Sequence, residues 1–452
     1  MQRYLDMANH MVWGAPALVL ILGVGIYLTM ATGFVQFRYF PRAIRTFFSR
    51  LAGRRENNGV SPFRALCTAL AATVGTGNLI GVAGAICLGG PGSIFWMWIC
   101  GFLGMALKFA EAVLAVRYRV TQGGEHFAGP MYMIRQGLPP RWHWLATVYS
   151  FFGVIAAFGV GNATQINGVI VSVNEAMGEF GIQPTMQGNL LLGIGLGLLI
   201  GAMFLGGAGR IGKCAELLVP FVSCGYLALC AGALITRASS IPEAFFAIVQ
   251  GAFCPGAVTG GILGSAFSAL RVGVSRGVFT TDAGMGTASI AHGSADVAHP
   301  GEQGLMGIVE VFLDTILICT MTALVILTSG VNIPYGTDVG GVLTAAAFVQ
   351  VYGDWVRVFL AFSLCCFALA TVLGWGLYGA RCAQYLFGER AWKAFALLQS
   401  GMVVLASVMQ TGILWSLAET VNGLMAIPNL IVLAALSPEL KRLTCEYKKF
   451  YG

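Results

Sequence analysis

Apolar residues fill most of the chain in stretches that are long enough to cross a lipid bilayer. A membrane-spanning helix needs about 20 predominantly apolar residues, and about eleven stretches of this kind can be marked out between short polar segments. They are residues 15–35, 63–88, 92–117, 144–176, 188–207, 214–236, 257–280, 303–330, 354–386, 391–410 and 412–436. The pattern predicts an all-α integral membrane protein.

The second span contains a segment whose residues disfavour a regular helix. Residues 69–84 read ALAATVGTGNLIGVAG, with a glycine on each side of Thr76. A glycine costs about 1 kcal/mol in a helix interior, and lipid cannot satisfy the backbone groups that a break exposes. Breaks therefore line cavities, where unwound helix ends bind ions and charged solutes. The alternative is close helix packing through Gly77, Gly81 and Ala85. We favour the break and expect residues 73–78 to bind a small charged solute and a cation.

The ten spans after the first divide into two halves of five. Each half begins with a glycine-interrupted span, and the second interruption lies within residues 260–291. Because five is odd, the halves have opposite orientations, and paired broken helices in inverted halves indicate a transporter site near the membrane midplane. The expected organisation is an extra N-terminal helix with a basic loop (1–62), a first repeat (63–236), an extracellular connection (237–256), a second repeat (257–436) and a cytoplasmic tail (437–452).

Composition and charge support a membrane protein and give its orientation. Only 10% of the residues are charged, against about 25% in soluble domains. Lysine and arginine gather in alternate loops, which places the N-terminus outside and the C-terminus in the cytoplasm. The net charge of +7 thus reflects orientation, and we expect no nucleic-acid partner. The cysteines are scattered without metal-binding spacing and are interpreted as small core residues.

Polar side chains in the middle of two further spans are candidates for binding. Asn162 and Gln165 lie three residues apart and share a helix face; a solute and a neighbouring helix compete for the Gln165 amide. Thr371 and Trp375 are four residues apart and also share a face. Thr371 offers a hard oxygen to a small cation and Trp375 a ring to close over a solute. The alternatives are a bond from Thr371 to its own helix and simple packing of Trp375.

Charged residues surround the second interruption. Arg271, Arg276 and Asp282 flank it, and Glu310 and Asp314 lie one turn apart in the next span. Charged side chains at this depth in a membrane carry a high free-energy cost, so residues of this kind are candidates for a function. We favour a structural interpretation here, an internal ion-pair network between the two spans.

Long stretches of the chain resemble the alanine or glycine:cation symporter family, also called the sodium:alanine symporter family, of the amino acid–polyamine–organocation superfamily. They are TALAATVGTGNLIGVAGAICLGGPGSIFWMW (68–98), KFAEAVLAVRYR (108–119), AGPMYMI (128–134), GVSRGVFTTDAGMGTASIAH (273–292), EQGLMGIVEVFLDTILICTMTALVILTSG (302–330) and TVLGWGLYGARC (371–382). The resemblance implies a leucine-transporter-like fold with two inverted five-helix repeats, one extra N-terminal helix and two broken helices.

The resemblance also implies an activity, symport of alanine or glycine into a bacterial or archaeal cell across the inner membrane with Na⁺ as coupling ion. No organic cofactor and no catalytic residue are expected, and the choice between monomer and homo-oligomer stays open. The substrate-binding residues implied are Thr73, Gly75, Thr76, Gly77, Asn78, Gln165, Phe267, Phe279 and Trp375, and those for Na⁺ are Thr73, Gly75 and Thr371. Ala370 stands where family members often have serine, so H⁺ coupling is kept as the alternative.

Two other classes of membrane protein compete with a transporter. An ion channel usually builds its pore from rings of residues in an oligomer, whereas the predicted symmetry lies inside one chain. An intramembrane enzyme needs a metal cluster or an activated nucleophile, and the sequence has no such ligand spacing and no base near Ser268 or Ser275. We therefore expect a transporter and not an enzyme.

Overall fold

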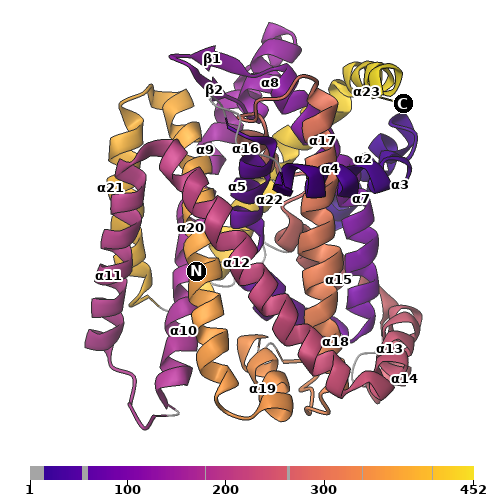
Figure 1. The fold of residues 1–452 in the computed structure, drawn as a ribbon, viewed down its shortest axis with the longest axis vertical. Helices are drawn as coiled ribbons and strands as arrows, with labels where there is room; N and C mark the ends of the chain where they lie inside the picture. Colours follow the sequence, from indigo (N-terminus) through magenta and orange to yellow (C-terminus); the bar gives the residue numbers. More distant parts are fainter. Residues whose placement is uncertain are drawn as a thin grey trace.

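The computed structural model is almost entirely helical (Figure 1) and describes residues 15–52, 60–178, 180–261, 265–337, 340–409 and 411–451. The elements before residue 237 are α2 (Ala15–Ala31), α3 (Val35–Arg38), α4 (Phe40–Ala52), α5 (Pro62–Thr73), η1 (Gly77–Gly81), α6 (Val82–Gly89), α7 (Gly92–Arg117), β1 (Val120–Gln122), β2 (Glu125–Phe127), α8 (Pro130–Gly137), η2 (Pro140–Trp142), α9 (Trp144–Phe158), η3 (Gly159–Ala163), α10 (Thr164–Gly178), α11 (Met186–Leu205) and α12 (Gly207–Thr236). The later elements are η4 (Ala238–Ser240), α13 (Ile241–Phe253), α14 (Pro255–Val258), α15 (Ala266–Thr281), α16 (Thr287–His292), α17 (Pro300–Val311), η5 (Phe312–Cys319), α18 (Thr320–Thr328), α19 (Gly340–Tyr352), α20 (Val356–Phe387), α21 (Ala391–Ala406), α22 (Thr411–Ala435) and α23 (Ser437–Tyr451).

The first predicted break is present. Ser61 caps the N-terminus of α5, where its side chain accepts a hydrogen bond from the Arg64 backbone N–H, and Pro62 is the first residue of the helix. Both residue types are common at these positions. Helix α5 ends at Thr73, and the chain resumes in the π-helical turn η1 and in α6, bent by 54° from α5. The glycines around Thr76 thus interrupt a helix, as the sequence predicts.

The second break lies between α15 and α16. Asp282, Gly284 and Gly286 adopt positive φ angles of 51°, 89° and 81°, in the left-handed region that glycine enters without strain. Three such residues within five end α15 after Thr281 and reorient the chain before Thr287. The sequence predicts an interruption in this region, and the structure locates it.

The helices coincide with the predicted apolar stretches. Fewer of them than the eleven predicted, however, are both long enough and apolar enough to cross a membrane. Among the described residues, six helices are long and apolar enough to cross a membrane, or up to eight when each bent pair counts as one span. Helices α2 and α21 have 17 and 16 residues, at the lower limit of about 17 residues for a span. The count of eleven spans and the inverted repeat therefore stay predictions.

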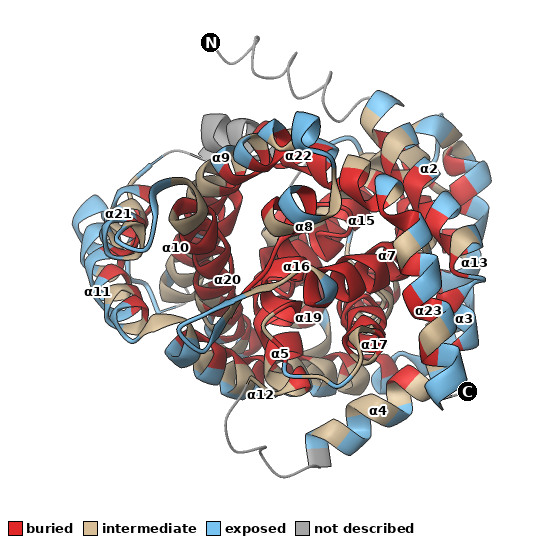
Figure 2. Ribbon diagram, turned by 90° about the horizontal axis from the view of Figure 1, so that it is seen from above, coloured by how far each residue is buried: buried red, intermediate tan, exposed pale blue. Residues whose placement is uncertain are grey.

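A central group of helices holds both breaks. Helix α7 packs against α15 and α17, and α20 packs against α9, α10 and α5, while α11 and α21 form an outer pair. Figure 2 shows the buried residues gathered around α5, α7, α16 and α20. On α11 the leucines at positions 191, 198 and 205 are 70–79% exposed and recur every seven residues, so an apolar stripe faces outward, as lipid contact requires.

The two ends of the bundle differ. At one end lie the strands β1 and β2, with α4, α8 and α23 (Figure 1), and at the opposite end lie α13, α14 and α19. We call them the hairpin end and the α19 end. The strands pair antiparallel around Gly123 and Gly124, both with positive φ, which suits a two-residue hairpin turn. The loop after α7 thus forms a β-hairpin at one end of the bundle, and residues 241–253 form α13 at the other.

Candidate functional site

The two breaks lie against each other in the interior. A Cβ added to Gly77 would lie 3.1 Å from Thr280 Cγ2 and 3.6 Å from Phe279 Cδ1, so the first break contacts the last turn of α15. Thr76 and Asn78 are fully buried. The first break and the last turn of α15, which leads into the second break, thus lie side by side in the buried interior.

Asn78 connects the first break to the π-helical turn η5. Its Oδ1 accepts a hydrogen bond of 2.9 Å from the Gly75 backbone N–H. Its Nδ2 donates to the Asp314 carboxylate at 2.7 Å and to the Asp314 carbonyl at 3.2 Å. The side chain therefore satisfies a backbone group that the break exposes and fixes the position of η5 beside it.

Gln165 reaches the same break from α10. Its Oε1 accepts hydrogen bonds from the Thr76 hydroxyl at 3.1 Å and from the Thr76 N–H at 3.4 Å, and its Nε2 donates to the Val160 carbonyl at 3.4 Å. The structure thus brings Gln165 to the predicted site, where the amide holds Thr76 in place.

Thr371 brings a hydroxyl from α20 to the end of α5. Its Oγ1 donates to the Phe367 carbonyl at 3.0 Å and to the Val74 carbonyl at 3.3 Å. A Cβ on Gly75 would lie 2.6 Å from this hydroxyl, so only glycine lets the two segments approach so closely. The Thr73 hydroxyl bonds weakly to its own helix, at 3.4 Å. The Thr371 hydroxyl and the Val74 carbonyl are hard oxygens of the kind that small cations bind.

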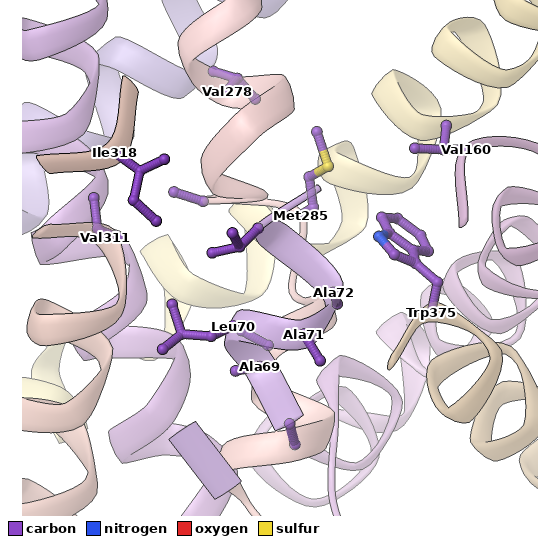
Figure 3. Packing of buried hydrophobic residues seen from close by; sticks show 14 of the residues in the cluster. Ala69, Leu70, Ala71, Ala72, Val160, Val278, Met285, Val311, Ile318 and Trp375 are labelled. Carbon is purple, nitrogen blue, oxygen red and sulfur yellow. The ribbon is translucent and has the colours of Figure 1, made fainter. Parts of the chain in front are cut away.

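The aromatic residues expected near the solute differ in position. Trp375 is buried, and Figure 3 shows its indole facing Ala72 of α5 and Met285 of the second break. Phe279 is half-buried next to Gly77. Phe267 is 60% exposed at the start of α15, about 18 Å along the helix from Phe279 at 1.5 Å per residue. The structure brings Trp375 and Phe279 to the breaks and leaves Phe267 away from them.

The buried charges do not pair as the sequence suggested. The Glu310 carboxylate lies 2.9 Å from the Lys108 ammonium of α7 and 2.7 Å from His292 Nε2 of α16. Asp314 instead accepts hydrogen bonds from Asn78 and from the Thr315 hydroxyl. Glu310 thus takes its lysine partner from α7 and not from the α15 span, because α7 packs between α15 and α17. A lysine inside an apolar stretch is the signal that could have indicated this pair.

A cavity of about 240 Å³ lies at the hairpin end of the site. Its lining includes Thr68 of α5 and Leu377 of α20, together with Arg381, Glu125 and His126. Arg381 donates to the Glu125 carboxylate at 2.8 Å. Burial and the positive charge of Arg119 lower the pKa of His126, so its imidazole is neutral at pH 7. The cavity therefore leads from the hairpin toward the helices that carry the first break.

A smaller cavity, of about 30 Å³, lies at the α19 end between α19, α20 and the first break. Thr344 of α19 donates to the Leu79 carbonyl at 2.9 Å, directly beyond the first break. This bond ties α19 to the first break at the end of the bundle opposite the hairpin.

Comparison with known proteins assigns this arrangement to a family. The sequence profile described as "Sodium:alanine symporter family" matches residues 1–451. The chain belongs to the sodium:alanine symporter family. It is 42% identical over 441 residues to a sodium/alanine symporter, AgcS, of Methanococcus maripaludis, covering 96% of this chain and 94% of that protein. It is 34% identical over 443 residues to a probable sodium/glutamine symporter, GlnT, of Bacillus subtilis, covering 97% and 88%.

A solved structure supports the fold expected for a sodium:alanine symporter family member. The crystal structure of MhsT in complex with L-phenylalanine superposes with a TM-score of 0.59 at 14% identity, covering 84% of this chain and 90% of that one. At this identity the similarity concerns the fold alone, which is that of leucine-transporter-like proteins. The sequence-based recognition of the family is confirmed, and the chain belongs to a family of membrane transporters.

Proposed function

We propose that this transporter carries a small neutral amino acid, alanine or glycine, into the cell together with Na⁺ by alternating access. The observation that carries the proposal is the buried, unwound first break, where the Thr371 hydroxyl of α20 lies 3.3 Å from the Val74 carbonyl. Unwound carbonyls bind cations, and half-helix N-termini bind carboxylates. A region of this kind suits a zwitterionic amino acid and a cation together.

Residues of four elements are assigned to the two solutes. Backbone groups of residues 73–78 with Thr76 and Asn78 bind the charged ends of the amino acid, Gln165 holds the break, and Trp375 and Phe279 border the side chain. Na⁺ is cargo in this proposal and binds between Thr371 and the carbonyls of residues 73–75. Binding of either solute raises the affinity for the other by the same factor, because both order the same segment.

The membrane topology belongs to the same proposal. Eleven spans, the first of them outside two inverted repeats of five, place the N-terminus outside and the hairpin end in the cytoplasm of a bacterial or archaeal cell. The cavity of about 240 Å³ is then the cytoplasmic access route. Rocking of one helix bundle against the other would open the site to the opposite side.

Uptake into proteoliposomes tests the proposal. Labelled alanine is offered under an inward Na⁺ gradient and, separately, under an inward H⁺ gradient, with glycine and glutamine as competitors. We expect alanine to accumulate with Na⁺. Accumulation with H⁺ alone would overturn the Na⁺ coupling. Transport of glutamine but not of alanine would contradict the proposed substrate. Glutamine is included because one relative is named a probable sodium/glutamine symporter.

A substitution at Thr371 tests the cation site. We expect Thr371→Ala to raise the Na⁺ concentration for half-maximal uptake at least about tenfold, a loss of about 1.4 kcal/mol, because the variant lacks the hydroxyl at the Val74 carbonyl. Thr371→Ser is the matched control, since it keeps the oxygen. The measurement is the Na⁺ dependence of initial uptake rates. A Thr371→Ala variant with an unchanged Na⁺ curve would remove Thr371 from the site.

A further inference from the structure

The segment that follows α2 combines exposed aromatic side chains with arginines. Residues 15–37 contain no charged side chain, whereas residues 38–52 contain four arginines and neither aspartate nor glutamate. Gly33 and Phe34 have positive φ angles of 67° and 57°, and they turn the chain from α2 into α3 and α4. In Figure 2, α4 runs lengthwise along the edge of the bundle. An apolar helix followed by a basic, amphipathic one at the edge is typical of a segment at a membrane surface.

One side of α4 attaches it to the helices of the candidate site. Tyr39 and Ala43 lie one turn apart and are buried. The ring of Phe40 lies 4.9 Å from that of Phe312 in η5. One turn after Ala43, the ring of Phe47 lies 6.1 Å from that of Phe63 in α5. Helix α4 is therefore held against η5 and α5, and its opposite side is left for another partner.

Three arginines of this segment have no acidic partner. Arg50 pairs with Glu302 at 3.2 Å. Within the described part of the chain, no carboxylate forms an ion pair with Arg38, Arg42 or Arg45. Arg38 and Arg45 are exposed, and Arg42 Nη1 is enclosed without a hydrogen-bond partner. An enclosed donor without an acceptor is costly, so Arg42 gains by turning toward an anion from outside the protein.

The three unpaired arginines are neighbours, and we call them the arginine cluster. The Cζ atoms of Arg38 and Arg42 lie 5.4 Å and 5.9 Å from the centroid of the same ring, that of Tyr39. Arg42 and Arg45 are three residues apart in α4, a spacing that places side chains next to each other on a helix surface. Guanidinium groups present paired donors that match the oxygens of a phosphate. The arginine cluster thus suits a phosphate group.

Exposed aromatic rings next to the arginine cluster indicate where that phosphate comes from. Phe34, Phe37 and Phe48 are each more than half exposed. The ring of Phe37 stacks on that of Phe102 in α7, with centroids 5.6 Å apart, and Phe102 itself is exposed. A free phosphate would satisfy the arginines but leave these rings in water. A phospholipid offers both a phosphate for the arginines and acyl chains for the rings.

We propose that the arginine cluster binds the headgroup of an anionic phospholipid, with the acyl chains along Phe37 and Phe102. A zwitterionic headgroup fits less well, because its own positive charge is repelled by the arginines. The bound lipid holds α4 in place and, through the contact of Phe40 with Phe312, also η5. Asp314 of η5 accepts the hydrogen bond from Asn78 at the first break, so the lipid stabilises the site from outside. The inference concerns a lipid partner and does not depend on which solute is transported.

The test measures lipid binding to the purified full-length protein in a neutral detergent. The probe is a fluorescent phosphatidylglycerol, and the same label on phosphatidylcholine is the comparison. We expect the wild type to bind phosphatidylglycerol at least about tenfold more tightly than phosphatidylcholine. The variant Arg38→Gln/Arg42→Gln/Arg45→Gln should lose this difference and bind phosphatidylcholine as the wild type does. Arg42→Lys, which keeps the charge but not the planar fork, should have an intermediate affinity.

A matched control removes the same number of positive charges away from α4. It carries glutamine at three basic positions that are exposed and lie near other elements, Arg141, Arg390 and Lys393. This control variant has the same net charge as the variant of the arginine cluster, so the two differ only in where the charge is lost. We expect the control to bind phosphatidylglycerol with the wild-type affinity.

Each other outcome overturns the proposal. Equal affinity of the wild type for the two lipids would show contact with acyl chains alone. Equal loss in the control variant would show general attraction by the net charge. Displacement of the probe by inorganic phosphate as readily as by unlabelled phosphatidylglycerol would assign the arginine cluster to a free anion. Should the triple variant fail to fold, Arg38→Gln/Arg45→Gln replaces it at two exposed side chains, and wild-type affinity in that variant refutes the site.

Discussion

Substitution of Gly75 by alanine is expected to lower the rate of alanine uptake by about 100-fold or more. The added Cβ would lie 2.6 Å from Thr371 Oγ1 and 3.2 Å from Gln165 Oε1. Neither neighbour is free to move, because Thr371 also bonds Phe367 and Gln165 also bonds Val160. The first break must therefore shift away from α20, and a displacement of about 1 Å in a binding site can cost 100-fold. Initial rates of labelled alanine uptake in proteoliposomes measure the effect.

Gly81→Ala is the matched control for this variant. Gly81 ends the turn η1 in the same interrupted helix, and a Cβ there meets nothing within 4 Å. Because alanine also favours helix more than glycine does, Gly81→Ala should fold and transport at least as well as the wild type. Gly75→Ala at the wild-type rate, in protein that elutes as a single folded species, would show that the contact between Gly75 and Thr371 plays no part in transport.

The first break could be predicted from the sequence because its cause is local. Two glycines and two polar residues within an apolar span are sufficient to disfavour a helix, whatever surrounds them. The second break could be placed only within residues 260–291, since glycines are spread along that stretch. The structure locates it at a non-glycine residue, Asp282, in the left-handed region, and tertiary packing rather than local preference holds a residue in that conformation.

The contacts between distant elements could not be predicted. Asn78 and Asp314 are 236 positions apart, and Lys108 and Glu310 are 202 apart. Sequence spacing shows which residues share a helix face, as it did for Thr371 and Trp375, but not which neighbouring helix that face meets. The same limitation explains why Phe267 was expected at the site. An aromatic side chain suits a solute site, but the sequence does not show that this residue lies at the far end of α15.

The pair formed by Lys108 and Glu310 is expected to have the largest effect on stability. Its two charged groups lie 2.9 Å apart and are at most 1% exposed, and α7 and α17 approach so closely here that a Cβ on Gly307 would lie 2.8 Å from the Lys108 carbonyl. Lys108→Met keeps a similar length but leaves Glu310 with His292 as its remaining partner. Removing one member of a buried ion pair costs about 3–5 kcal/mol. The free energy of unfolding of the purified protein in detergent should fall by that amount.

A double variant separates the charge from the packing. Lys108→Met combined with Glu310→Gln removes both charges, and the glutamine oxygen still accepts a hydrogen bond from His292 Nε2. Because a buried pair can often be replaced by neutral residues at little cost, the double variant should recover most of the lost stability, and the coupling energy of the cycle measures the pair. Arg117→Gln on the same helix is the control, since the 48% exposed Arg117 pairs with Glu439 near water and such pairs contribute about 1 kcal/mol or less. Equal stability of the single and double variants would mean that α7 and α17 are held together by packing alone. Recovery would mean that the loss in the single variant comes from the unpaired charge of Glu310 and not from lost packing between α7 and α17.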